Sequence, residues 1–242
     1  PATRRLHRVV APVLSRVSKL PVADDAVFAA GQRLYDRLDA VHRILADPEI
    51  TSARLVVNPE RMVVAEARRT FTQLSLFGYQ VDAVIVNRVL PDEVSDPWFD
   101  RWRDTHAEHL EAICSDFAPV PVLRSQLAPC DVVGVDALRL VGEELWSDCD
   151  PFDRLSTRRP LQLRRYESDG GYELTVDLPF AERSDVDVAR SGDELLITLG
   201  AQRRALALPE SLRRREIVSA TVADGALRVR FAEPVERGKM GA

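Results

Sequence analysis

The run VDAVIVNRVLP, residues 81–91, is too apolar to keep one face in water. Strands of this kind are covered on both faces, which is typical of parallel sheets flanked by helices. The shorter run ARLVVN, residues 53–58, has the same character and also ends in asparagine. Between the two runs, residues 60–77 repeat apolar side chains at helical spacing and stop at Gly78, a residue that commonly ends a helix. Strand, helix and strand in this order predict a parallel α/β fold.

The alternation continues beyond the second strand. A second helix is predicted in residues 96–117, a third strand in PVPVL, residues 119–123, and a further helix in residues 134–146. Ligands of open parallel sheets bind at the carboxyl ends of the strands. We therefore expect Asn58, Asn87 and a turn at Leu123 and Arg124 to share that edge of the sheet.

On either side of this α/β part, apolar residues recur with different spacings along the sequence. Residues 3–46 predict amphipathic helices, interrupted at Pro21, because apolar residues recur there at spacings of three and four. These apolar residues are Leu6, Val9, Val13, Val17, Leu34, Leu38, Val41 and Leu45. Beyond a polar stretch with two prolines, apolar and polar residues alternate, and SGDE and ADGA are typical of hairpin turns. The chain is therefore divided into residues 1–150, with helices in 1–48 and the α/β part in 52–147, and an all-β sandwich in 158–234.

Composition excludes several classes of protein. The balance of 33 basic and 38 acidic residues gives a net charge of −5, which argues against a nucleic-acid partner. No apolar run approaches the roughly 18 residues of a membrane span, and no secretory leader is recognisable, so a cytoplasmic location is predicted. The three cysteines, Cys114, Cys130 and Cys149, have long and irregular spacing, which favours reduced thiols over disulfides.

The usual phosphate-binding motifs are absent from the sequence. A P-loop needs glycines followed by lysine and a hydroxyl residue, but the only two lysines, Lys19 and Lys239, lack that context. A dinucleotide-binding glycine motif is also missing. Hydrolysis of a nucleotide by these residues alone is therefore not expected.

Two clusters of aromatic and imidazole side chains have an ordinary structural explanation. His106 and His109 lie one helical turn apart, and a solvated helix face is favoured over a metal site because no second ligand cluster accompanies them. Trp98, Phe99 and Trp102 near the start of the same helix favour core packing over a stacking platform.

Several stretches resemble the C-terminal portion of the arsenite-transporting ATPase (ArsA) family, which includes the targeting ATPases for tail-anchored membrane proteins. They are TSARLVVNPERMVVAEARRTFTQLSLFGYQVDAVIVNRVLP, from Thr51, and APVPVLRSQLAPCDVVGVDALRLVGEELW, from Ala118. Residues 158–234 resemble the small α-crystallin-like domain of some bacterial members through YELTVDLP, ALALPESL and DGALRVRF. The resemblance implies part of a P-loop-NTPase-type sheet, without its P-loop segment, followed by a small β-sandwich.

The resemblance also implies a ligand and its contacts. Family members hold ATP with Mg²⁺ between dimer-related domains, and their phosphate loop and switch regions lie upstream of the residues present here. What remains would be the adenine end of the site. The family's base-recognising asparagine corresponds to Asn87, with Arg88 beside it, while Pro121, Val122 and Leu123, in the turn after the third strand, would flank the ring. An asparagine that only caps the following loop is the alternative for Asn87.

Three functions remain open from the sequence, and an unrelated enzyme whose catalytic groups no motif reveals is the least favoured of them. The resemblance implies ATP-driven ion efflux or protein targeting, with a P-loop half supplied by the same or another chain, in a homo- or heterodimer. A membrane-protein client or a membrane transporter would be a further partner. The paired cysteines that hold zinc or arsenite in some relatives have no counterpart here, so neither a catalytic residue nor a metal ligand is assigned. The alternative is a non-catalytic, chaperone-like protein that binds hydrophobic protein segments.

Overall fold

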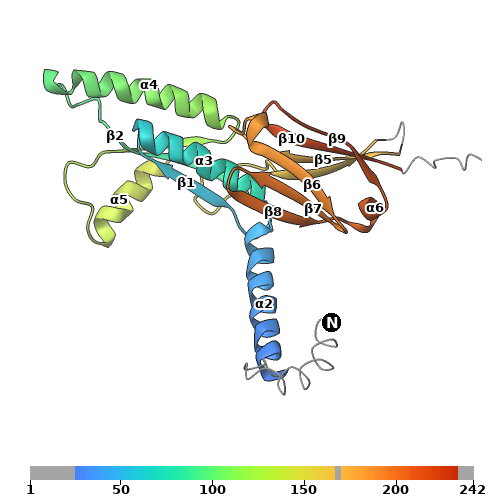
Figure 1. Cartoon of the computed structure of the whole chain (residues 1–242). Helices are drawn as coiled ribbons and strands as arrows, with labels where there is room; N and C mark the ends of the chain where they lie inside the picture. The colour runs from blue at the N-terminus through green and yellow to red at the C-terminus, as the bar shows by residue number, and fades with distance from the viewer. Residues whose placement is uncertain (1–24, 167–169, 234–242) are drawn as a thin grey trace, which may run out of the picture. The chain divides into compact units, whose positions relative to one another are not determined.

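The computed structural model describes residues 25–166 and 170–233 (Figure 1). The chain separates into two units, residues 1–47 and 48–242. In the first unit, α2 (Asp25–Ala46) confirms the helix predicted around Leu34 and Leu38. The helix predicted from Leu6 to Val17 lies outside the described residues.

The second unit begins with the parallel α/β part. Its strands are β1 (Ala53–Val57), β2 (Val81–Val89) and β3 (Val122–Gln126), in the order β1-β2-β3. The connecting helices are α3 (Arg61–Phe77), a short 3-10 turn η1 (Pro97–Phe99) and α4 (Asp100–Phe117), and α5 (Val135–Leu145) follows β3. Both strand pairs are parallel, which confirms the predicted fold class. β2 is the central strand, and this explains its continuous apolar run.

One core joins the sheet to α3 and α4. Val84 and Val86 of β2 are fully buried against Phe71 of α3 and Phe117 of α4. The rings of Phe71 and Phe117 meet edge to face, 5.4 Å between centroids. Gly78 ends α3 with a φ of 86°, as predicted from its position after the last apolar residue.

The remaining strands form two antiparallel sheets, as the period-two pattern predicts. One has the order β4-β5-β10-β9 and the other β6-β7-β8. Their bounds are β4 (Leu161–Arg165), β5 (Tyr172–Asp177), β6 (Val186–Ser191), β7 (Glu194–Leu199), β8 (Gln202–Ala207), β9 (Glu216–Ala223) and β10 (Ala226–Ala232), with short helices η2 (Arg183–Asp185) and α6 (Glu210–Arg213). Val176 of β5 and Ile197 of β7 are both fully buried in one core between the sheets. The predicted Asp-Gly turn joins β9 to β10 with positive φ at Asp224 and Gly225.

The end of α3 is part of the core of the β-sandwich. Leu76 belongs to α3, yet its fully buried side chain packs among the apolar residues of β5, β7 and β10. The Arg204 guanidinium of β8 donates a hydrogen bond to the carbonyl of Leu76, and the Thr72 hydroxyl donates one to the carbonyl of Pro179. The α/β part and the sandwich therefore share buried surface through one helix.

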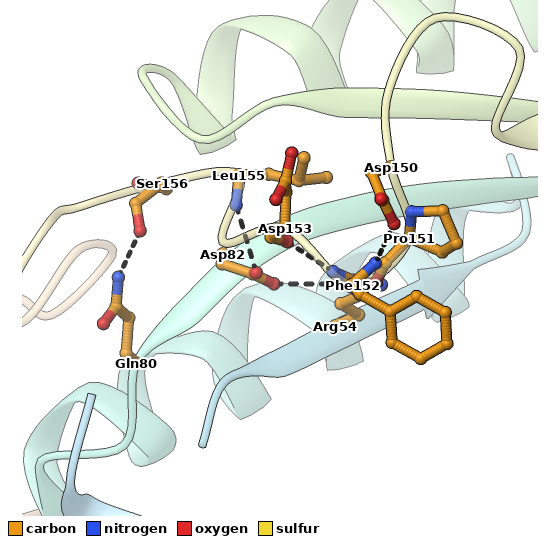
Figure 2. Close-up of polar contacts among 9 residues, drawn as sticks. All are labelled: Arg54, Gln80, Asp82, Asp150, Pro151, Phe152, Asp153, Leu155 and Ser156. Carbon is orange, nitrogen blue, oxygen red and sulfur yellow. Dashed lines mark hydrogen bonds and ion pairs between the residues drawn. The ribbon is translucent and has the colours of Figure 1, made fainter. Parts of the chain in front are cut away.

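A polar junction attaches the connecting segment, residues 150–156, to the beginning of β2 (Figure 2). The fully buried carboxylate of Asp82 pairs with the Arg54 guanidinium at 3.3 Å and accepts the Leu155 N–H at 3.3 Å. Arg54 also donates to the carbonyls of Pro151, at 2.7 Å, and Asp153, at 3.0 Å. Because Asp82 lies near the start of β2, this junction is at the opposite end of the strand from its carboxyl end.

Candidate functional site

A hollow of about 300 Å³ lies where the three parallel strands end. Asn58, Pro59 and Glu60 line it from the turn after β1. The other lining residues are Arg88 and Leu90 at the end of β2, Phe99, Trp102 and His106 from η1 and α4, and Leu127 after β3. This volume is at the lower end of the roughly 300–1,000 Å³ of small-molecule sites, so it suits one ring system rather than a large ligand.

Arg88 reaches the hollow from a bulge in β2. Its φ is 60°, in the left-handed region that residues other than glycine rarely adopt. Val86 pairs with Arg124, and the next pair joins Val89 to Gln126, so β2 contains one extra residue over this interval. A left-handed residue costs about 1–3 kcal/mol and persists where the surrounding structure holds it, often at functional sites.

The wall provided by α4 is aromatic. The rings of Trp102 and His106 meet edge to face with 5.9 Å between their centroids. Trp98 and Trp102 are 71% and 49% exposed, so the expectation that they pack in the core is wrong. The spacing of Phe99, Trp102 and His106 places them on one helical face, and this signal could have identified the wall from the sequence.

His106 contributes an imidazole ring to the lining of the hollow. Its Nδ1 accepts the backbone N–H of Leu90 at 3.4 Å, longer than the roughly 2.7–3.2 Å that is usual for N–H donors, so this hydrogen bond is a weak one. Partial burial and then the neighbouring His109 lower the pKa of His106 below its ordinary value, whereas Glu60 opposes this shift. The ring is therefore neutral at pH 7, and Nε2 carries the proton because Nδ1 acts as an acceptor.

The polar groups of the hollow suit a flat ring with hydrogen-bonding edges. Arg88 contributes donors only, Asn58 contributes both donors and an acceptor, and neutral His106 contributes one N–H donor. Asn58 also donates to Glu60 at 3.4 Å, which orients its amide. Trp102 and Phe99 add apolar ring surface, so the hollow combines stacking with recognition of a ring edge.

Of the five predicted contact residues, the structure places one in the lining of the hollow and four outside it. Arg88 lines the hollow, whereas Asn87 is partly buried beside it and is not among the lining residues. Pro121, Val122 and Leu123 lie immediately before β3 and at its beginning, not in a turn after it.

The error in placing Pro121, Val122 and Leu123 comes from the bounds of β3. The strand was expected in residues 119–123 but occupies residues 122–126, where Val122 and Leu123 pair with the middle of β2. The turn after the strand therefore begins at Leu127, whose N–H donates to the carbonyl of Val89 at 2.8 Å.

Residues 25–166 and 170–233 contain no group of three or more His, Cys, Asp and Glu side chains placed to hold a metal ion. Cys114, Cys130 and Cys149 are all free thiols. Among the same residues, no helix combines the length and apolar character needed to cross a bilayer.

Comparison with known proteins identifies the family. Residues 2–147 match the family model of the anion-transporting ATPases. The chain belongs to this family. Residues 169–231 match the model of the HSP20-like domain found in ArsA proteins, so this member of the anion-transporting ATPase family also has the small heat-shock-like domain. Both matches confirm the resemblance drawn from the sequence.

Relatives of this family member have longer chains. The "Putative arsenical pump-driving ATPase 1" of Aquifex aeolicus is 32% identical, over 88% of this chain and 54% of its own length. The "ATPase GET3B" of Arabidopsis thaliana is 28% identical, over 55% of this chain and 32% of its own length. The small heat shock protein AgsA from Salmonella typhimurium, C-terminally truncated, aligns with a TM-score of 0.26 and 16% identity over 34% of this chain and 92% of its own. The chain thus spans about half the length of the bacterial pump ATPases that it matches.

Proposed function

We propose that this chain supplies the base-binding wall of an ATP site in an anion-transporting-type ATPase. The observation that carries the proposal is the convergence of Arg88, Asn58 and His106 with Trp102 at the carboxyl ends of three parallel strands. That edge is where open α/β sheets bind ligands. Family membership selects ATP among the flat ring ligands that such a hollow suits.

The base contacts follow from the chemistry of the lining groups. The guanidinium of Arg88 would donate to ring nitrogens of the purine, and an asparagine amide oxygen would accept from its exocyclic amino group. Asn87, next to Arg88 in the bulge, is proposed as a base contact because of its place in the family motif. Leu127, which lines the hollow after β3, is proposed to flank the ring in place of Pro121, Val122 and Leu123.

The triphosphate would be held by groups outside these 242 residues. The sequence contains no P-loop, and the bacterial relatives have about twice the matched length. A phosphate-binding half, on the same or another polypeptide, would complete the site in a homo- or heterodimer. Hydrolysis of the bound ATP, with Mg²⁺, would drive ion efflux, in keeping with the printed name of the Aquifex aeolicus relative, or protein targeting, which the family resemblance implies.

We expect Arg88→Gly to weaken ATP binding by about 5- to 150-fold, since lost hydrogen bonds to a ligand are worth about 1–3 kcal/mol. Glycine tolerates the left-handed conformation of residue 88, so this variant should be at least as stable as the parent chain. Asn87→Ala should weaken the binding of ATP by a factor in the same range, and it should reduce the preference for ATP over GTP. Isothermal titration calorimetry on the full chain measures both affinities.

The control for the Arg88 variant is Arg101→Ala, which removes an exposed arginine of α4 outside the hollow. Its ATP affinity should match that of the parent chain. If Arg88→Gly and Asn87→Ala both bind ATP as tightly as the control, this edge of the sheet is not the base site. Saturable ATP binding that weakens in Arg88→Gly by the expected factor, with an unchanged melting temperature, would support the proposal.

A second candidate function is the binding of apolar protein segments. On α2, seven large apolar side chains are between 42% and 65% exposed: Val27, Leu34, Tyr35, Leu38, Val41, Ile44 and Leu45. Exposed apolar surface of this extent commonly marks a binding face. The helix-in-groove mode of peptide recognition uses apolar anchors at this helical spacing.

This second function has its own test. Replacing Leu34, Leu38 and Val41 together by serine should weaken binding of an apolar peptide of about 20 residues, the length of a membrane span, at least tenfold. Fluorescence anisotropy of the labelled peptide measures this binding. The control, Gln32→Ala with Arg37→Ala, alters exposed polar positions of the same helix. Equal peptide affinity in all three proteins would exclude α2 as the binding face.

A further inference from the structure

The end of β2 lacks ordinary strand pairing where it enters the hollow. Pairing with β1 ends at Val86, and pairing with β3 passes from Val86 to Val89. Asn87 and Arg88 therefore have no register partner on either neighbouring strand. The position of Arg88 depends on how the chain is held immediately after the bulge.

Two contacts hold the chain after the bulge, one from each side. Leu127 donates its N–H to the carbonyl of Val89 at 2.8 Å, which attaches β2 to the segment after β3. On the other side, Nδ1 of His106 accepts the N–H of Leu90 at 3.4 Å, which attaches β2 to α4. His106 is itself held against Trp102, so α4 presents a fixed acceptor to the end of β2.

We propose that His106 is a positioning residue, which fixes the end of β2 through Leu90 so that Arg88 faces a purine bound in the hollow. The inference rests on the proposed nucleotide site, because the ligand of the hollow is taken from that proposal. His106 would act on the base mainly through the backbone of β2. Its removal should therefore affect binding even though most of the donors in the hollow are untouched.

The acceptor role requires a neutral ring. The charged or titratable groups around His106 are His109 on α4, Glu60 before α3 and Arg88 on β2. Burial and His109 lower the pKa of His106 below 6.5, so the ring is neutral above that pH. Protonation as the pH falls through the lowered pKa would convert Nδ1 into a donor facing the Leu90 N–H, and would add a cation to the cavity that Arg88 also lines. Ligand binding should therefore be full above pH 6.5 and decrease below it.

The test uses adenosine as the probe, because it lacks the phosphates whose own charge changes in this pH range. Calorimetric titrations compare the parent chain with His106→Leu, which removes the acceptor, and with His106→Asn, which keeps an acceptor near the position of Nδ1. At pH 7.5 we expect His106→Leu to weaken adenosine about tenfold and His106→Asn to stay within about threefold of the parent chain. His109→Leu, one helical turn away and outside the lining, is the matched control.

The pH dependence gives a second readout that a merely structural role would not produce. The parent chain should lose affinity for adenosine as the pH falls below 6.5 through the lowered pKa of His106, whereas His106→Asn should not. If His106→Leu does not fold, as judged by circular dichroism, the pH dependence of the parent chain and of His106→Asn alone decides whether His106 has this role. Adenosine binding that is equal in the parent and all foldable variants, and independent of pH, would overturn the role of His106 and leave the nucleotide site standing. Absence of adenosine binding by the parent chain at pH 7.5 would overturn both.

Discussion

Replacing Leu76 by alanine is expected to lower the free energy of unfolding of the second unit by about 3 kcal/mol. The side chain is fully buried, and large-to-small changes at such positions cost roughly 2–5 kcal/mol through lost burial and a residual cavity. Although Leu76 belongs to α3, its cavity would open in the core of the β-sandwich. Both parts of the unit should therefore lose stability together.

Two optical signals separate the parts in this experiment. All three tryptophans, Trp98, Trp102 and Trp146, lie in the α/β part, so their fluorescence reports on that part, whereas far-ultraviolet circular dichroism also reports on the sandwich. In urea, Leu76→Ala should move both midpoints down by the same amount. Met62→Ala, at an 81% exposed position of the same helix, should leave them nearly unchanged. A shift of the dichroism midpoint alone would show that the two parts unfold independently.

Replacing Asp82 by alanine should lower the free energy of unfolding by about 3 kcal/mol. This is the second of the two large effects that we expect. Removing one partner of a buried pair costs roughly 3–5 kcal/mol because the other charge is left uncompensated. The lower end applies, since the Arg54 side chain is 23% exposed and keeps two carbonyl acceptors in the connecting segment. The partly buried N–H of Leu155 would also lose its acceptor.

The matched variants for Asp82 separate charge from hydrogen bonding. Asp82→Asn keeps an acceptor for Leu155 but loses the charge opposite Arg54, so its cost should lie between those of the parent and the alanine variant. Asp92→Ala, at an exposed position beyond β2, should change stability by less than about 0.5 kcal/mol. Urea denaturation measures all three. The junction contributes nothing to stability if Asp82→Ala unfolds at the same urea concentration as Asp92→Ala.

The site was predicted only in part because its residues come from separate segments. The sequence motif indicated Arg88, and the rule for parallel sheets indicated Asn58 and the carboxyl edge. The sequence predicts a solvated face for His106 and core packing for Trp102, because nothing in their local pattern shows which strand ends they approach. The three-residue displacement of β3 moved Pro121, Val122 and Leu123 away from the expected turn, since strand bounds are the least certain part of a sequence pattern.

The sequence by itself determined the types and order of the elements and the family. Apolar runs predicted the parallel strands, helical spacing ending at Gly78 predicted α3, and alternation with Asp-Gly predicted the sandwich. These features follow from local periodicity and backbone preference, which neighbouring residues encode. The tertiary structure alone decided that Leu76 packs in the core of the other part, that Arg88 stands in a left-handed bulge, and that His106 meets Leu90. Such contacts depend on strand register and helix placement, where a shift of one residue reverses the face that a side chain occupies.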